Sequence, residues 1–228
     1  MNLIITGCEY AGTTTFAKAI GSWMRSAMGG IQEIHDHFKL PDIACYRLGR
    51  PAEPLNNQEL EQILGWTPKL QEMAQRQSLM CHMPNTSTAD DYILVDYHIG
   101  DAVYGPRFFG YGQEHELQGG QRSKYARRTE KHLLDQAPDT ILVTITASLD
   151  AISTRMASKP HSYAIVQSKD VEPVLAAFTQ EHENSIIPNK IMIDSTDTTV
   201  EEMVATFRSS MQPFLSIQDR RRLAMLKN

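Results

Sequence analysis

Hydrophobic positions along the chain fall into two patterns that alternate from one end to the other. Short apolar runs predict β-strands, and apolar residues repeated at spacings of three and four predict helices with one buried face. The predicted strands span residues 3–5, 31–38, 91–96, 140–146 and 190–194. The predicted helices include residues 13–28, 60–64, 70–80, 122–136, 149–156, 171–178 and 200–211. This alternation implies an α/β fold, in which a parallel sheet is covered by helices on both faces.

Glycines mark the turn between the first strand and the first helix. Residues 7–14, GCEYAGTT, match the phosphate-binding pattern GxxxxGK[ST] at every fixed position except residue 13, where threonine replaces lysine. Backbone N–H groups of such a loop form an anion-binding nest, and the positive end of the helix dipole adds to it. The hydroxyl of Thr14 occupies the position that holds Mg²⁺. We therefore predict nucleotide binding by Gly7, Tyr10, Ala11, Gly12, Thr13, Thr14 and Thr15.

The missing lysine normally places a cation beside the β- and γ-phosphates of a nucleotide. The loop can hold a phosphate without it, but neutralising a triphosphate then requires a cation from another part of the chain. Lys18 lies about one helical turn beyond Thr14, which is more typical of a solvated lysine on a helix face. A glycine-rich turn that binds no ligand is the structural alternative.

Titratable residues follow the predicted strand at 91–96 and suggest acid–base chemistry. A carboxylate at a strand end could accept a proton from a substrate hydroxyl or hold Mg²⁺ through water, and a histidine could transfer protons near neutral pH. We predict catalytic roles for Asp96, His98 and Asp101, and a metal-binding role for Asp96. The alternative for Asp101 is a cap on a helix that starts at Ala102.

Two further segments are predicted to face a substrate. Asp36 and His37 lie near the end of the strand at 31–38, where open α/β sheets bind their ligands. Solvated loop residues are the alternative for this pair. Residues 105–121 are rich in glycine and aromatic residues and predict a long loop on the substrate side, with Tyr104 just before it as a further substrate contact.

Composition limits the classes of protein that need to be considered. The length of 228 residues suits a single domain, and the net charge of −5 gives no reason to expect nucleic-acid binding. The sequence has no run of about 18 apolar residues, so no membrane span is predicted. Three cysteines without metal-ligand spacing, and a first strand that leaves no room for a signal peptide, favour a cytoplasmic protein. A homodimer stays open as an assembly state.

The order of segments resembles the thymidylate kinase branch of the P-loop nucleoside and nucleotide kinases along nearly the whole chain. GCEYAGTTT at 7–15 corresponds to a degenerate form of the family's phosphate loop, and ILVDYHIGDAVYG at 93–105 to its strand that ends in a catalytic aspartate. APDTILVTITASLDAISTRMASKPH at 137–161 is similar to the family's strand, short helix and arginine-bearing lid. KIMIDST at 190–196 is similar to the segment beside the adenine.

The resemblance implies a three-layer P-loop fold and a phosphotransferase that uses ATP and Mg²⁺ on a nucleotide or small-molecule acceptor. It also implies a catalytic role for Arg155 in a lid at 155–170, and nucleotide contacts from Lys159 and Asp194. Besides Thr13, the chain departs from the family at Tyr97, which stands where the family has an arginine beside its aspartate. Arg155 and Lys159 could supply the cationic charge that phosphoryl transfer requires.

Two other functions stay open. Sulfotransferases that use 3′-phosphoadenosine 5′-phosphosulfate share this fold and often end the loop in Gly-Thr-Thr, as residues 12–14 do here. They usually carry a basic residue just before that glycine, where this chain has Tyr10-Ala11, and an arginine where it has Thr146. The other alternative is a module that binds a nucleotide without turning it over.

Overall fold

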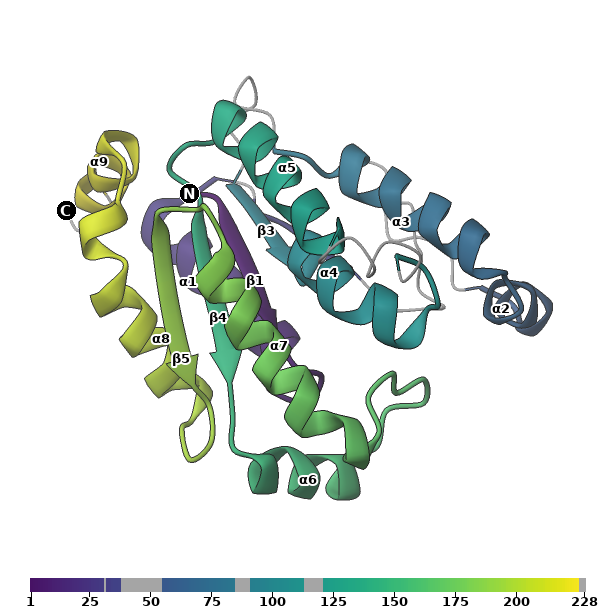
Figure 1. Cartoon of the computed structure of the whole chain (residues 1–228). Helices are drawn as coiled ribbons and strands as arrows, with labels where there is room; N and C mark the ends of the chain where they lie inside the picture. The colour runs from purple at the N-terminus through teal and green to yellow at the C-terminus, as the bar shows by residue number, and fades with distance from the viewer. Residues whose placement is uncertain (31, 38–54, 85–90, 113–120, 226–228) are drawn as a thin grey trace.

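The computed structural model of this protein describes residues 1–30, 32–37, 55–84, 91–112 and 121–225. Its centre is a parallel sheet of five strands in the order β2-β3-β1-β4-β5 (Figure 1). The strands are β1 (Leu3–Gly7), β2 (Gln32–Asp36), β3 (Asp91–Val95), β4 (Ile141–Thr146) and β5 (Asn189–Asp194). The predicted α/β fold is confirmed, and a strand overlaps each of the five predicted ranges, although Ile31 and Phe38 lie outside the described residues.

Burial explains why the middle of the sheet forms. β1 is buried at every position and lies between β3 and β4, so that Ile5 pairs with Val95 on one side and with Val143 on the other. Both faces of such a strand are removed from water, which is why its sequence is a continuous apolar run. Each fully buried aliphatic side chain contributes about 1.5–3 kcal/mol relative to an exposed one. The sheet centre is therefore a firm base for the loops at the carboxyl ends of its strands.

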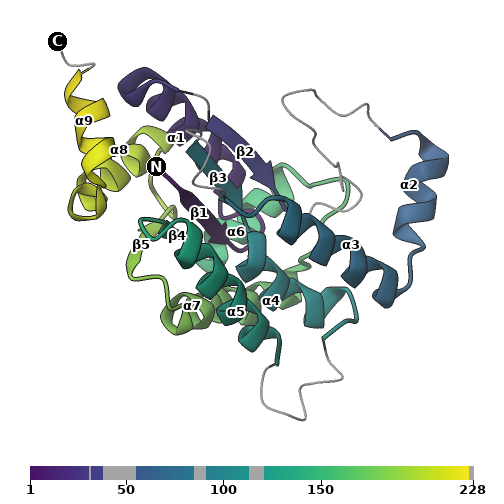
Figure 2. The ribbon, with the colours of Figure 1, turned by 90° about the horizontal axis from the view of Figure 1, so that it is seen from above.

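Helices cover both faces of the sheet, as predicted (Figures 1 and 2). One face carries α1 (Thr13–Met28), α8 (Val200–Ser210) and α9 (Ile217–Met225). The other face carries α4 (Tyr97–Phe108), α5 (Gln121–Gln136) and α7 (Val171–Asn184). α6 (Leu149–Ser158) lies at the carboxyl ends of the strands (Figure 1), and α2 (Asn57–Leu64) and α3 (Pro68–Cys81) lie towards one side of the molecule (Figures 1 and 2). Short 3₁₀ helices span Ser168–Asp170 and Gln212–Phe214.

For the segment after β3, one prediction is wrong and the alternative considered for Asp101 does not hold. α4 begins at Tyr97 rather than at Ala102, so Asp101 lies inside the helix and does not cap it. α4 also continues to Phe108, so the first part of the predicted loop at 105–121 is helical, whereas residues 113–120 lie outside the described residues. The glycines and the proline of this segment disfavour a helix, but burial of residues 97–106 overrides that preference.

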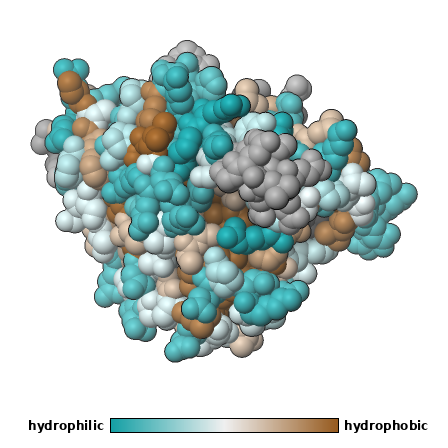
Figure 3. Space-filling model, viewed as in Figure 1, coloured by the Kyte–Doolittle hydropathy of each residue, from teal (hydrophilic) through white to brown (hydrophobic). Residues whose placement is uncertain are grey.

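The side of the molecule that faces the viewer in Figure 1 mixes hydrophilic with hydrophobic residues at its surface (Figure 3). Scattered exposed apolar side chains are normal for a folded protein in water. Among the described helices, none has both the length and the apolar composition that a membrane span needs.

Candidate functional site

The segment after β1 forms a tight loop whose shape depends on glycine at two positions. At Gly7, a Cβ atom would lie 2.3 Å from the carbonyl oxygen of Ile145 on β4, so the neighbouring strand excludes any side chain. At Gly12 the φ angle is 99°, a left-handed conformation that L side chains rarely adopt. The Ala11 N–H donates to the Cys8 carbonyl (2.9 Å), and α1 starts directly after Gly12. The chain thus passes from strand to helix through a left-handed turn.

Side chains from distant elements hold this loop in place. The Tyr104 hydroxyl of α4 accepts a hydrogen bond from the Glu9 N–H (3.0 Å) and donates one to the Gly7 carbonyl (3.2 Å). The Ser195 hydroxyl, just after β5, donates to the Ala11 carbonyl (2.8 Å). Burial raises the pKa of Tyr104 well above its usual value, so the phenol stays neutral at physiological pH. We predicted a substrate contact for Tyr104, but its hydroxyl lies against the loop backbone.

Arg155, which was predicted to be catalytic, has its guanidinium among main-chain carbonyls. It donates to the Tyr10 carbonyl and the Ser195 hydroxyl (3.1 Å each), and to the carbonyls of Ser195 and Thr196. These contacts join the phosphate loop to the segment that follows β5. In this arrangement Arg155 positions the loop.

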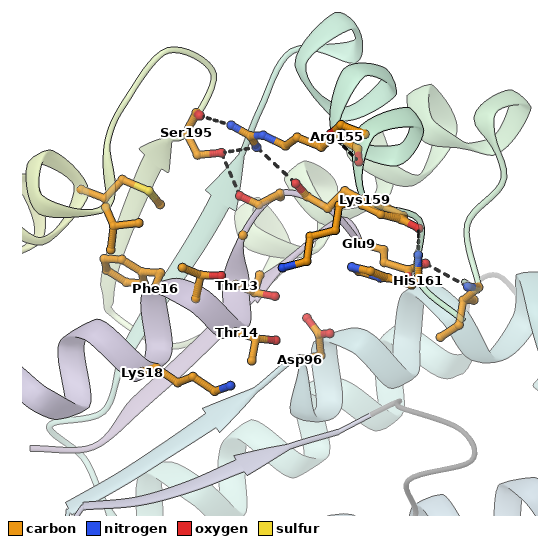
Figure 4. Close-up of a pocket in the computed structure, with 18 of the residues that line it drawn as sticks. Glu9, Thr13, Thr14, Phe16, Lys18, Asp96, Arg155, Lys159, His161 and Ser195 are labelled. Atoms are coloured by element: carbon orange, nitrogen blue, oxygen red, sulfur yellow. Dashed lines mark hydrogen bonds and ion pairs between the residues drawn. The ribbon is translucent and has the colours of Figure 1, made fainter. Parts of the chain in front are cut away.

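A cavity of about 790 Å³ opens beside the loop. This volume suits a nucleotide-sized ligand, because ligand pockets typically measure roughly 300–1,000 Å³. Figure 4 shows side chains that converge on the cavity from the loop, from α1 and from the α6 region. The predicted site residues that border it are Tyr10, Ala11, Gly12, Thr13, Thr14, Thr15, Asp96, Tyr104, Arg155 and Lys159.

Oxygen donors gather at one end of this cavity. The Thr14 hydroxyl donates to the Asp36 carboxylate at the end of β2 (2.9 Å), and Asp96 lies beside Thr14 (Figure 4). Asp96 has a φ angle of 61°, a strained conformation that costs roughly 1–3 kcal/mol and often marks a functional site. Hydroxyl and carboxylate oxygens are the ligands that Mg²⁺ prefers, and one or two carboxylates suffice when phosphates complete its shell. Thr14 and Asp96, which border the cavity, therefore fit a magnesium ion, and Asp36 holds the Thr14 hydroxyl.

His98 and Asp101 lie away from the cavity, because α4 starts directly after Asp96 and directs both side chains into its packing contacts. The buried His98 ring faces Glu130 of α5 (Nε2 to Oε1, 3.0 Å). Asp101 is also buried and accepts a hydrogen bond from the Tyr111 hydroxyl (3.0 Å). Burial alone would raise the pKa of Glu130, but the contact with His98 and neighbouring donors outweighs it and lowers that pKa. This geometry gives no support to catalytic roles for His98 and Asp101.

His37 and Asp194, two other predicted contacts, lie outside the cavity lining, as do Gly7 and Asp36. His37, predicted to face substrate, is buried, hydrogen-bonded to the Ser78 hydroxyl (3.2 Å), with its ring edge-on to His82 (5.0 Å between centroids). Asp194, predicted to contact the nucleotide, is exposed at the end of β5 and accepts a hydrogen bond from the Thr196 N–H (2.8 Å). The first side chain belongs to a packed histidine cluster, and the second stabilises a turn.

Tyr97 and Cys8 carry reactive groups that are fully buried. The Tyr97 hydroxyl donates to the Leu79 carbonyl (2.6 Å), so this residue cannot replace the arginine that the kinase family carries at its position. Burial, together with the nearby charges of Glu9 and Asp96, raises the pKa of Cys8 to about 12. The thiol is therefore protonated at neutral pH and is no candidate nucleophile.

Sequence analysis did not predict roles for Glu9, His161 and Ser195. The Glu9 carboxylate pairs with His161 Nδ1 (2.7 Å), 152 residues along the chain, and Ser195 reaches the loop from 184 residues away. No local pattern connects such distant partners. Glu9 could have been noticed in the sequence, because a carboxylate inside a predicted phosphate loop repels a phosphate and therefore needs a partner of its own.

Comparison with known proteins identifies the fold. No family model and no curated protein matches the chain. Deoxyadenosine kinase from M. mycoides with bound dATP is 14% identical and covers 92% of this chain and 99% of its own, with a TM-score of 0.52. The dCTP-bound form is 12% identical, covers 93% and 100%, and has a TM-score of 0.55. A Pseudomonas aeruginosa PA01 protein assigned as polyphosphate kinase 2 is 16% identical and covers 98% and 40%, with a TM-score of 0.54.

The chain therefore has the α/β fold of P-loop kinases, with a parallel sheet and helices on both of its faces. Identities at this level show a shared fold. Activity and substrates have to be argued from the site itself.

Proposed function

We propose that this protein is a P-loop phosphotransferase that uses ATP and Mg²⁺ and acts on a nucleotide, a nucleoside or another small molecule. One observation carries the proposal: a braced left-handed loop lies next to the Thr14–Asp36 pair and Asp96. Backbone amides suit the phosphates of a donor, and the oxygen donors suit the metal that accompanies them. Phosphoryl transfer needs both in one place.

Donor binding would rest on the loop and the start of α1. Loop N–H groups and the positive end of the helix favour an anion at this position. Thr14 and Asp96 would hold Mg²⁺, which neutralises charge on the phosphoryl group when it is bound. Asp36 accepts the hydrogen bond of the Thr14 hydroxyl and so sets the direction of that oxygen. Such prior orientation supports a reaction that depends mainly on positioning and electrostatics.

Asp96 is the candidate for accepting a proton from the acceptor hydroxyl or orienting a metal-bound water. Its N–H donates to the Ile5 carbonyl of β1 (2.7 Å), which fixes the residue at the sheet edge. The residue is only half-buried and borders the cavity. A carboxylate at a fixed position beside the phosphates is suited to general base catalysis.

The test measures binding and transfer separately. ATP with Mg²⁺ should stabilise the protein, by about 2.7 kcal/mol at 100 times the dissociation constant. Transfer of the γ-phosphate is then followed on deoxynucleosides and their monophosphates, because deoxyadenosine kinase shares the fold. Asp96→Asn should keep ATP affinity and lower turnover about 100-fold or more. Asp135→Asn, on the exposed side of α5, is the matched control and should change neither quantity.

Each outcome separates the alternatives. Full turnover in Asp96→Asn would reject the catalytic assignment of that residue. Stabilisation by 3′-phosphoadenosine 5′-phosphosulfate and not by ATP would favour a sulfotransferase, which the kinase matches do not favour. ATP binding without transfer to any acceptor would indicate a nucleotide-binding module.

A further inference from the structure

The cavity needs a cation that the phosphate loop does not supply. The pattern GxxxxGK[ST] has lysine just before the metal-binding hydroxyl, and this chain has Thr13 there. Among the described residues, the lysines and arginines that border the cavity are Lys18, Arg155 and Lys159. They differ in what their charged groups contact.

Arg155 is engaged in structural contacts. Its guanidinium donates to three main-chain carbonyls and to the Ser195 hydroxyl. To reach a phosphate it would have to leave these acceptors, and the loop would lose one of its braces. Each such charged hydrogen bond is worth roughly 1.5–3 kcal/mol.

Lys18 points to a different end of the cavity. It lies four residues after Thr14, which places it about 6 Å further along the axis of α1 and away from the loop. Figure 4 shows its side chain on the far side of Thr14 from Thr13. A cation there would meet the proposed metal site rather than the nest of backbone amides.

Lys159 points at the loop. It follows α6 directly, and its N–H donates to the carbonyl of Arg155 (3.0 Å), the residue that braces the loop. Figure 4 shows its side chain extending towards Thr13, so that the ammonium faces the start of α1. The charge therefore lies near the position from which the usual lysine is missing.

Glu9 ties the segment after Lys159 to the phosphate loop. Its carboxylate accepts hydrogen bonds from the N–H groups of Ile165 (2.8 Å) and Val166 (2.9 Å) and pairs with His161 (2.7 Å). Glu9 borders the cavity, and these three partners satisfy its carboxylate there. They also explain how a phosphate loop can tolerate a carboxylate.

Tyr10 makes a second connection to the same segment. Its ring stacks on the His161 ring with 4.0 Å between centroids, and its hydroxyl accepts a hydrogen bond from the His161 N–H (2.9 Å). Residues 159–166, which we name the lid segment, are thus held to the loop by two consecutive loop residues. The backbone that carries Lys159 is fixed from both sides.

We propose that Lys159 supplies the cation for the β- and γ-phosphates of the donor in place of a lysine at position 13. Glu9 acts as the positioning residue that keeps the lid segment, and with it the ammonium, at the loop. This inference rests on the proposed function and deepens it. Donor recognition then depends on the lid segment. If the lid segment were released from Glu9, the loop would have only its backbone amides to bind the distal phosphates.

The test compares a nucleotide with and without distal phosphates. Lys159→Met should weaken binding of ATP with Mg²⁺ about 10–100-fold and leave AMP affinity within about twofold. Lys159→Arg should keep most of the preference for ATP. Lys169→Met, an exposed lysine just beyond the lid segment, is the matched control and should bind both nucleotides as the wild type does. An unchanged ratio of ATP to AMP affinity in Lys159→Met would overturn the proposal.

A rescue experiment tests whether Lys159 takes the role of the missing lysine or only adds positive charge near the site. Thr13→Lys restores the lysine of the ordinary pattern, so it should return ATP affinity in the Lys159→Met background to within about threefold of the wild type. If Thr13→Lys instead improves binding equally in both backgrounds, the two positions act independently and the proposal fails.

Glu9→Ala tests the positioning role. Removal of a carboxylate from a phosphate loop should by itself raise affinity for an anion. The proposal expects the reverse, a loss of ATP affinity, and expects Lys159→Met to add little in that background, since the two residues act as one unit. A gain in ATP affinity would overturn the role of Glu9. If the wild type binds neither ATP nor AMP, the proposed function itself fails, whereas ATP binding that ignores Lys159 rejects only this inference.

Discussion

The loop after β1 and the segment after β3 meet at the same edge of the sheet, but they are built in different ways. The loop owes its shape to its backbone, with glycine at 7 and 12 and carbonyls held by side chains from other elements. After β3, the chain turns at Asp96 straight into α4. There the helix decides where each side chain points, because each step along it rotates the direction by about 100°.

The comparison shows which kinds of site can be read from a sequence. A site made of backbone N–H groups depends on where the chain can turn, and glycine spacing reports that directly. A site made of side chains after a strand depends on the start of the following helix. Because α4 starts at Tyr97, directly after Asp96, His98 and Asp101 face Glu130 and Tyr111 instead of the cavity.

The largest expected effect comes from Gly12→Val. A Cβ at this position meets no atom within 4 Å, so the side chain would project into open space that borders the cavity, and the φ of 99° would be strained. We expect ATP affinity to fall about 100-fold or more, with a loss of stability of only about 1–2 kcal/mol, the usual cost of a left-handed β-carbon. Titration calorimetry and thermal unfolding measure the two quantities.

Gly7→Ala is the matched substitution at a glycine that the fold itself requires. Its Cβ would meet the Ile145 carbonyl at 2.3 Å, so it should lower thermal stability more than Gly12→Val does. Wild-type ATP affinity in Gly12→Val would show that the loop is only a turn between strand and helix.

A smaller effect, on stability alone, is expected for His98→Ala. The substitution leaves the fully buried Glu130 carboxylate without its histidine partner, although Arg127 and the Ile186 N–H still contact it. We expect a loss of about 3 kcal/mol, the low end for breaking a buried pair. Turnover per folded molecule should stay within about threefold, because the ring lies outside the cavity. His132→Ala, exposed on α5, is the control. A large loss of turnover without a loss of stability would show that His98 takes part in catalysis.

The sequence predicted the five strands, both helical layers and the loop, because apolar runs and glycine spacing are local signals. It also placed Thr14, Asp96 and Lys159 at the cavity. It could not predict the contacts of Glu9 with the lid segment or of Ser195 with the loop, which join positions more than 150 residues apart. Such contacts exist only once the sheet order is set, and a single sequence does not encode that order locally.

The smallest effect concerns acid stability and the histidines behind β2. Burial, and then the nearby rings of His82, His35 and His98, lower the pKa of His37 to about 3. An unfolded chain protonates this residue near pH 6.5, whereas the folded chain does not until about pH 3. Between those values the unfolded state binds more protons, so stability falls as pH falls, by up to about 1.4 kcal/mol per pH unit.

His37→Gln should flatten this dependence. Glutamine can keep a hydrogen bond to the Ser78 hydroxyl but has no proton to gain, so the variant should be less stable at pH 7.5 and lose less stability on going to pH 5. Urea unfolding of variant and wild type between about pH 4.5 and 6.5 isolates His37 by difference, because His182 and Glu130, whose pKa values are also lowered, contribute equally to both proteins. His132→Gln, on the exposed face of α5, should keep the wild-type slope. Equal slopes in all three proteins would show that the histidines behind β2 take up protons in the folded state. The His37 side of this strand end would then be as accessible to solvent as the Asp36 side.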